Sequence, residues 1–110
     1  MADAYKTLVQ AAIPTTAAQI GVAVPGGKSW IPGRWVVVNT NASGPLFFQL
    51  FKNGLVSPFH ITGLFGLQAG GYATEDFLGA MAAAEFLAGV ASGTGLVLMV
   101  EGDAARLGRR

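Results

Sequence analysis

The sequence contains no cysteine, one histidine and few charged residues. The absence of cysteine excludes disulfides, thiolate zinc sites and thiol nucleophiles, and it leaves the redox compartment open. Charged residues make up 12% of the 110 residues, against about 25% in an average soluble domain. The formal net charge is +1, without the basic patch that marks nucleic-acid-binding domains. We therefore expect no nucleic-acid partner.

Long apolar segments are also missing. The longest, residues 77–91, is shorter than the roughly 20 residues that a membrane-spanning helix needs, and it contains Glu85. The first residues lack the basic region and the continuous apolar run of a signal peptide. We expect a protein that is made in the cytoplasm and does not enter a membrane.

Apolar residues dominate what is present. Hydrophobic residues account for 52% of the chain, and a chain of this length normally forms one domain. These charged residues are too few to cover the surface of a typical soluble monomer. We therefore expect part of the apolar surface to be buried against other chains.

The chain is organised around residues 34–54, which hold two runs rich in β-branched and aromatic residues. A cluster of Asn, Ser, Gly and Pro at residues 41–45 separates the runs, and the pair Asn53-Gly54 closes the second. This pattern is typical of neighbouring antiparallel strands and predicts a meander.

Both faces of these central runs are apolar, because successive strand side chains point to opposite sides of a sheet. This predicts a second sheet on one face and a partner subunit on the other. The predicted core residues are Val36, Val38, Leu46, Phe48, Leu50, Leu96 and Leu98. The predicted oligomer interface consists of Trp35, Val37, Phe47 and Phe51.

Further strands are predicted on both sides of the central runs. They cover residues 5–13, 18–24, 55–62, 64–68 and 96–101, with turns at 25–27 and 69–71. The fold class is therefore all-β, an antiparallel β-sandwich of about eight short strands. Gly102 is expected to end the last strand, so that residues 1–102 form one domain and residues 103–110 a short basic tail that contributes little to folding.

Residues 74–91 carry two competing signals. Thr74 suits the N-cap of a helix and residues 80–84 are mostly alanine, whereas Gly79 and Gly89 would each destabilise a helix by about 1 kcal/mol relative to Ala. The all-β context favours two strands, about residues 75–80 and 85–91, joined by an alanine-rich turn. A helix stays open as the alternative.

No motif predicts a catalytic, cofactor or metal site. Gly26-Gly27-Lys28-Ser29 is similar to the end of a phosphate-binding loop, but position 22 is not glycine and no helix follows, so we interpret it as a turn. His60 is interpreted as structural, because no sequence neighbour completes a metal or nucleophile set. Glu75 and Asp76 would face opposite sides of a strand and cannot act as a catalytic pair.

The aromatic residues offer an alternative reading. Trp30, Trp35, Tyr5 and Tyr72 would form a sugar-stacking face if they shared one surface, although core or interface packing explains them without a ligand.

Several strand and turn segments, taken in order, carry a resemblance to a known family. They are Thr7 to Gln10, Pro14-Thr15-Thr16, Val24-Pro25-Gly26-Gly27, Val36 to Thr40, Phe48 to Gly54, Leu67 to Gly71 and the final Leu-x-Leu-x-Val-Glu-Gly. They resemble small virion proteins of tailed bacteriophages, of the head-decoration and head-fibre β-sandwich type. The resemblance spans residues 5–102. In that family two strands flank a turn with Gly-Asp, where this chain has Ala84-Glu85.

The resemblance implies a jelly-roll-like sandwich that assembles as a homotrimer on the capsid surface and clamps neighbouring major capsid subunits. It implies a structural role without enzymatic activity or cofactor. Arg106, Arg109 and Arg110 in the tail are then candidates for contact with the capsid or an adjacent subunit. Alternative functions are a tail or head-fibre base component and a small carbohydrate-binding module.

Overall fold

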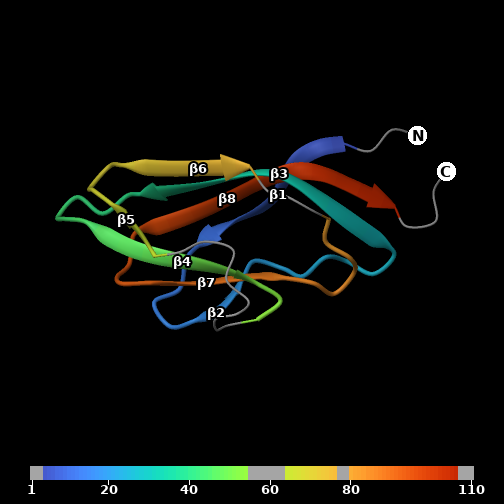
Figure 1. The fold of residues 1–110 in the computed structure, drawn as a ribbon, viewed down its shortest axis with the longest axis horizontal. Coiled ribbons are helices and arrows are strands. Elements are labelled where there is room, and N and C mark those ends of the chain that lie inside the picture. The colour runs from blue at the N-terminus through green and yellow to red at the C-terminus, as the bar shows by residue number, and fades with distance from the viewer. Residues whose placement is uncertain (1–3, 55–63, 77–79, 107–110) are drawn as a thin grey trace.

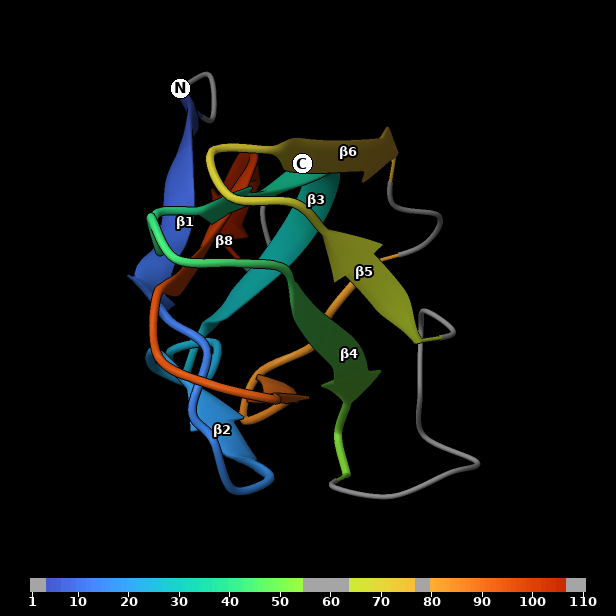
Figure 2. The ribbon, with the colours of Figure 1, turned by 90° about the vertical axis from the view of Figure 1, so that its left-hand side faces the viewer.

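The computed structural model describes residues 4–54, 64–76 and 80–106, which form eight β-strands and no helix. The strands are β1 (Ala4–Ala12), β2 (Ala18–Ile20), β3 (Lys28–Asn39), β4 (Leu46–Lys52), β5 (Phe65–Leu67), β6 (Tyr72–Asp76), β7 (Leu87–Ala91) and β8 (Leu96–Arg106). They build two antiparallel four-stranded sheets, ordered β1-β8-β3-β6 and β2-β7-β4-β5. Figures 1 and 2 show the sheets as the two layers of a sandwich. The predicted all-β class is confirmed.

Consecutive strands lie in opposite sheets, with the exception of β4 and β5. The predicted meander of residues 34–54 is therefore wrong, because β3 and β4 do not pair. They face each other across the core, where the rings of Trp35 and Phe48 meet edge to face with centroids 6.0 Å apart. β3 and β4 each have an apolar face that is stable only when buried. Because they lie in opposite sheets, each buries the apolar face of the other.

The side chain of Asn39 fixes the connection between β3 and β4 through hydrogen bonds. Its side chain is fully buried, and its amide Nδ2 donates hydrogen bonds to the carbonyl oxygens of Leu67 at 3.0 Å and Gly44 at 3.3 Å. Its Oδ1 accepts a hydrogen bond from the backbone N–H of Asn41 at 2.9 Å. A buried amide with these partners is tolerated in a core, and it ties the 40–45 connection to the end of β5.

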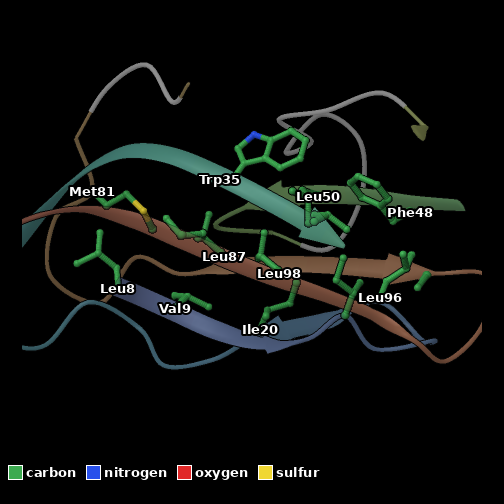
Figure 3. Close-up of a cluster of buried hydrophobic side chains, with 14 of the residues drawn as sticks. Leu8, Val9, Ile20, Trp35, Phe48, Leu50, Met81, Leu87, Leu96 and Leu98 are labelled. Carbon is green, nitrogen blue, oxygen red and sulfur yellow. The ribbon is translucent and has the colours of Figure 1, made fainter. Parts of the chain in front are cut away.

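The alternation predicted for β4 and β8 is confirmed. Inward-facing side chains of both strands are buried in one hydrophobic cluster: Leu46, Phe48, Leu50, Leu96, Leu98 and Val100. Figure 3 shows side chains from the two sheets meeting in this cluster. The rings of Phe48 and Phe65 stack there with centroids 5.5 Å apart.

The face predicted for β3 is inverted. Val38 is exposed and Val36 half-buried, whereas Trp35 and Val37 are buried in the core. The cause is a β-bulge between Pro32 and Arg34, where the pairing of β3 with β8 shifts by one residue. A bulge adds one residue to one strand only, so even-numbered positions face inward before it and odd-numbered positions after it.

Gly102 does not end the last strand, and residues 103–106 are not a tail. The strand β8 continues to Arg106 and pairs with β1 and β3 on both sides. Gly102 lies opposite the bulge, where an added Cβ would meet the Ile31 carbonyl oxygen and lie 2.6 Å from the Cα of Pro32. Glycine at this position therefore permits a close approach of two backbones rather than a chain reversal.

Residues 74–91 contain no helix within the part that the structure describes. Of the two strands predicted there, β7 lies within residues 85–91, whereas β6 shares only residues 75 and 76 with the predicted strand 75–80. The alanine-rich link turns at Ala84, which has a φ of 72°, and the N–H of Glu85 bonds the carbonyl of Ala82 at 3.1 Å. The strand predicted at residues 18–24 is shorter, because Gly21 has a φ of 70° and leaves the ladder. The strand predicted at residues 55–62 lies outside the described residues.

Candidate interaction surface

The outer face of the β1-β8-β3-β6 sheet carries two adjacent rows of mainly apolar side chains. The strand register places Tyr72 of β6 beside Val38 of β3, and Val38 beside Val97 of β8. In the next row Val36 lies between Thr74 of β6 and Met99 of β8. The rows end on β1 at Ala12 and Gln10. We call Val36, Val38, Tyr72, Val97 and Met99 the apolar rows.

These side chains are accessible within a single chain. Tyr72 is 69% exposed and Val38 38% exposed, while Val36, Val97 and Met99 are half-buried. Their neighbours along β8, Leu96, Leu98 and Val100, point into the core, so alternation directs the apolar rows outward. The exposure of an aromatic and a β-branched side chain side by side is the feature expected of a contact surface.

A charged row borders the apolar rows. Arg34 donates from its guanidinium to a carboxylate oxygen of Glu101 at 2.9 Å, and Asp76 of β6 lies opposite Arg34 on the other side. The Arg34 side chain is half-exposed, so this ion pair adds little to stability. Its significance is its position, because it marks where charge begins on this face.

The four residues predicted as an oligomer interface do not share a surface. Trp35 and Val37 point into the core because of the bulge in β3. Phe51 is buried within the single chain although it lies on the side of β4 away from the main cluster, beside Ala88 of β7. Only Phe47 is exposed, at 46%, on the outer face of the other sheet, where its ring covers Gly66. The prediction that Trp35, Val37 and Phe51 face a partner is wrong.

Four connections gather at one end of the sandwich, which we call the loop end: residues 13–17, 40–45, 68–71 and 92–95. Figure 1 shows them opposite the start of β1 and the end of β8. Hydrogen bonds join them: both the N–H and the hydroxyl of Thr40 donate to the Gly95 carbonyl at 2.7 Å, and Asn41 Nδ2 donates to the Thr94 carbonyl at 3.1 Å. The N–H of Phe47 donates to Ser92 Oγ at 2.9 Å. These loops are therefore held in place before any partner binds.

Charge is segregated along the molecule. The charged residues that the structure describes are Lys6, Lys28, Arg34, Lys52, Glu75, Asp76, Glu85, Glu101, Asp103 and Arg106. Glu75 pairs with Trp35, one residue nearer the loop end than Arg34. The others lie in the row of Arg34 or between that row and the end opposite the loops, as the pairing of Lys28 with Arg106 and of Lys52 with Leu87 indicates. Residues 35–51 and 86–100, which build most of the loop-side half, contain no charged residue. We call this half the neutral half.

The remaining predicted residues contribute no common site. Of the four residues interpreted as a turn, Gly26 and Gly27 form one, with a φ of 77° at Gly27 and a hydrogen bond from the Lys28 N–H to the Pro25 carbonyl, whereas Lys28 and Ser29 begin β3. Arg106 ends β8 at the charged end, and His60, Arg109 and Arg110 lie outside the described residues. Of the proposed sugar-stacking residues, Trp30 and Trp35 are buried.

Sequence reasoning missed Val97 and Met99, placed Val36 and Val38 in the core, and considered Tyr72 only as a sugar-stacking residue. Because Leu96 and Leu98 are predicted core residues, strand alternation places Val97 and Met99 on the outer face. Nothing in the sequence indicates that Tyr72 and Val38 lie beside them. Among the described residues, no three His, Cys, Asp or Glu side chains gather as a metal-binding group. The described part of the chain contains no helix that is long and apolar enough to cross a membrane.

Comparison with known proteins adds no relative. No protein-family model matches the chain, and no curated protein is significantly similar to it in sequence.

Proposed function

We propose that the chain is a structural protein of a tailed-bacteriophage virion, a decoration protein that forms a homotrimer on the capsid surface and stabilises contacts between major capsid subunits. The observation that carries the proposal is the nested strand order, in which β1 pairs with β8, β2 with β7, β3 with β6 and β4 with β5. We interpret this order as a jelly roll, a double-sheet architecture that occurs in viral capsid proteins and also in lectins and cupins.

Because one architecture serves several functions, the surface supplies the second argument. A protein that covers the joints between other subunits needs a broad, preformed contact surface. The hydrogen-bonded loop end and the apolar rows provide such a surface. Because the loops are already ordered, binding costs little conformational entropy, and because the surface has no charged side chain, no charge has to be desolvated. If each oligomer makes several weak contacts with the capsid at once, its overall affinity exceeds that of any single contact.

A carbohydrate-binding role has less support. Two of the four aromatic side chains suggested for sugar stacking, Trp30 and Trp35, are part of the core. Of the four, only Tyr72 is known to be exposed among the side chains that the structure describes. Because only one of the three described rings is exposed, the described residues favour protein contact over sugar binding.

The test is co-sedimentation of the purified protein with undecorated capsids and with isolated tails of a candidate phage. We expect saturable binding to capsids and a higher capsid melting temperature, since a ligand that binds the assembled state stabilises it. Binding to tails alone would replace the decoration role by that of a tail or fibre-base component. Binding to neither particle would refute a virion role.

The basic residues of the C-terminus are tested in the same assay. If Arg109 and Arg110 contact the capsid, a chain that ends at Arg106 should bind more weakly, and its affinity should depend less on salt, because exposed charge contacts are screened. Unchanged affinity and salt dependence would remove these residues from the contact.

A further inference from the structure

We infer that Asn53 is a site of spontaneous deamidation, whose reaction is suppressed by the native fold and released when the end of β4 opens. The chain contains three asparagines, and only Asn53 precedes a glycine. In this reaction the backbone nitrogen of the following residue attacks the side-chain amide. Glycine hinders the attack least, because it has no Cβ and its backbone rotates most freely. The inference does not depend on the proposed function.

The reaction takes place within the chain and needs only water as a co-reactant. The backbone nitrogen of Gly54 forms a bond to Cγ of Asn53, the bond from Cγ to Nδ2 breaks, and ammonia leaves with the proton of the Gly54 N–H. The product is a five-membered succinimide ring. Water then opens the ring at one of its two carbonyls, which gives either aspartate or isoaspartate, in which the main chain runs through Cγ.

Two hydrogen bonds to Phe86 hold Asn53 directly after the end of β4. The N–H of Asn53 donates to the Phe86 carbonyl at 2.9 Å, and Asn53 Oδ1 accepts a hydrogen bond from the Phe86 N–H at 2.8 Å. In a regular antiparallel pair the two residues exchange both bonds through their backbones. Here the side-chain oxygen of Asn53 takes the place of its backbone carbonyl, and both Asn53 and Gly54 are half-buried.

The backbone conformation of Asn53 keeps the two reacting atoms apart. Its φ is 63°, and a non-glycine residue with such a φ belongs to the left-handed region, where ψ is about +47°. This ψ places the Gly54 nitrogen anti to the Asn53 side chain across the Cα–C bond. The nitrogen reaches Cγ only after the peptide unit has rotated and Phe86 has released Oδ1, so the native hydrogen bonds oppose ring closure.

Local opening makes the reaction possible in an otherwise folded molecule, because segments of a protein open without global unfolding. The two products then differ in what the fold retains. Aspartate keeps an oxygen that accepts the hydrogen bond of the Phe86 N–H, whereas isoaspartate lengthens the main chain by one atom beside β7. The isoaspartate content of the folded protein therefore records how often the end of β4 has opened.

The experiment incubates the full chain in mildly alkaline buffer, with and without guanidinium chloride, and follows deamidation by mass spectrometry of the protein and its peptides. Asn39 and Asn41 are the internal reference, because neither precedes glycine. Phe86→Pro removes the N–H that holds Oδ1. Phe86→Ala is the matched control, because it also lacks the ring but keeps the N–H, and thermal melting verifies that both variants are folded.

We expect Asn53 to react faster than Asn39 and Asn41 in the unfolded chain, and at least about tenfold more slowly in the folded than in the unfolded chain. Folded Phe86→Pro should react about tenfold faster than Phe86→Ala, a factor that corresponds to about 1.4 kcal/mol, near the upper end for one hydrogen bond. Equal rates at Asn53 in folded and unfolded wild type would overturn the inference, even if Phe86→Pro does not fold. Equal rates in the two folded variants, or no preference for Asn53 in the unfolded chain, would overturn it as well.

Discussion

The substitution Gly102→Ala tests how the bulge in β3 is built. An added Cβ at Gly102 would lie 2.6 Å from the Cα of Pro32 and 2.8 Å from the backbone N of Gly33, far inside an ordinary van der Waals contact. The strand β8 cannot move away from β3, because β1 pairs with it on the other side and Lys6 lies opposite Gly102. The methyl group must therefore displace backbone that is hydrogen-bonded on both sides.

The expected loss of stability follows from two effects. Overpacking of a closely packed site costs about 1–3 kcal/mol, and each ladder hydrogen bond broken by the displacement costs about 1 kcal/mol. With one or two bonds broken, we expect the free energy of unfolding to fall by about 2–5 kcal/mol, a large part of the roughly 5–15 kcal/mol that stabilises a domain.

Urea unfolding measures this change, with the fluorescence of the buried Trp30 and Trp35 as the probe and linear extrapolation to water. Gly26→Ala is the control, because nothing lies within 4 Å of its added Cβ, and it should shift the free energy of unfolding by less than about 0.5 kcal/mol. A loss below about 1 kcal/mol for Gly102→Ala, on the scale of an ordinary surface change, would refute the close approach at the bulge and with it the assignment of faces on β3.

Three further changes test other parts of the fold by the same unfolding measurement. Phe48→Ala should lower the free energy of unfolding by about 3–5 kcal/mol, because the ring is fully buried, whereas Phe47→Ala should lose less than half of that; equal losses would contradict the assigned faces of β4. Asn39→Leu should lower it by about 2–4 kcal/mol, since it leaves the Leu67 carbonyl and the Asn41 N–H without their buried partner, and a neutral result would show that the connection does not depend on this amide. A chain that ends at Gly102 should be less stable than one that ends at Arg106 by several kcal/mol, about 1 kcal/mol for each ladder hydrogen bond removed, because residues 103–106 pair with β1 and β3; equal stability would make these residues the tail that the sequence predicts.

Much of the local structure follows from the amino-acid pattern. Alternation at residues 46–50 and 96–100 assigned the buried side chains of β4 and β8 correctly, because neither strand has a bulge in that stretch and side chains then alternate without interruption. The turns at residues 25–27 and 69–71 also follow, since glycine adopts the positive φ found at Gly27 and Gly70 at little cost.

The candidate surface could not be derived in the same way. Its two most exposed members, Tyr72 and Val38, are far apart in the sequence and become neighbours only through the pairing of β3 with β6. The segregation of charge has the same origin. The charged residues that the structure describes are spread from Lys6 to Arg106, and strand register places all of them except Glu75 in the row of Arg34 or on its side away from the loops.

The sequence by itself determined that this chain is built mainly of β-strands and carries few charges, because those properties depend on residue type and short-range period. It left a helix open at residues 74–91, where the structure describes two strands and no helix. Only the tertiary structure decided which face of β3 is buried, that β3 and β4 lie in opposite sheets, and that Gly102 continues a strand. The physical reason is that strand alternation divides the side chains between the two faces of the sheet but does not show which face is buried. The extra residue at Gly33 reverses the two faces for the residues that follow it. The bulge fits because Gly102 of β8, which lies opposite it, has no Cβ to clash with the backbone of Pro32 and Gly33.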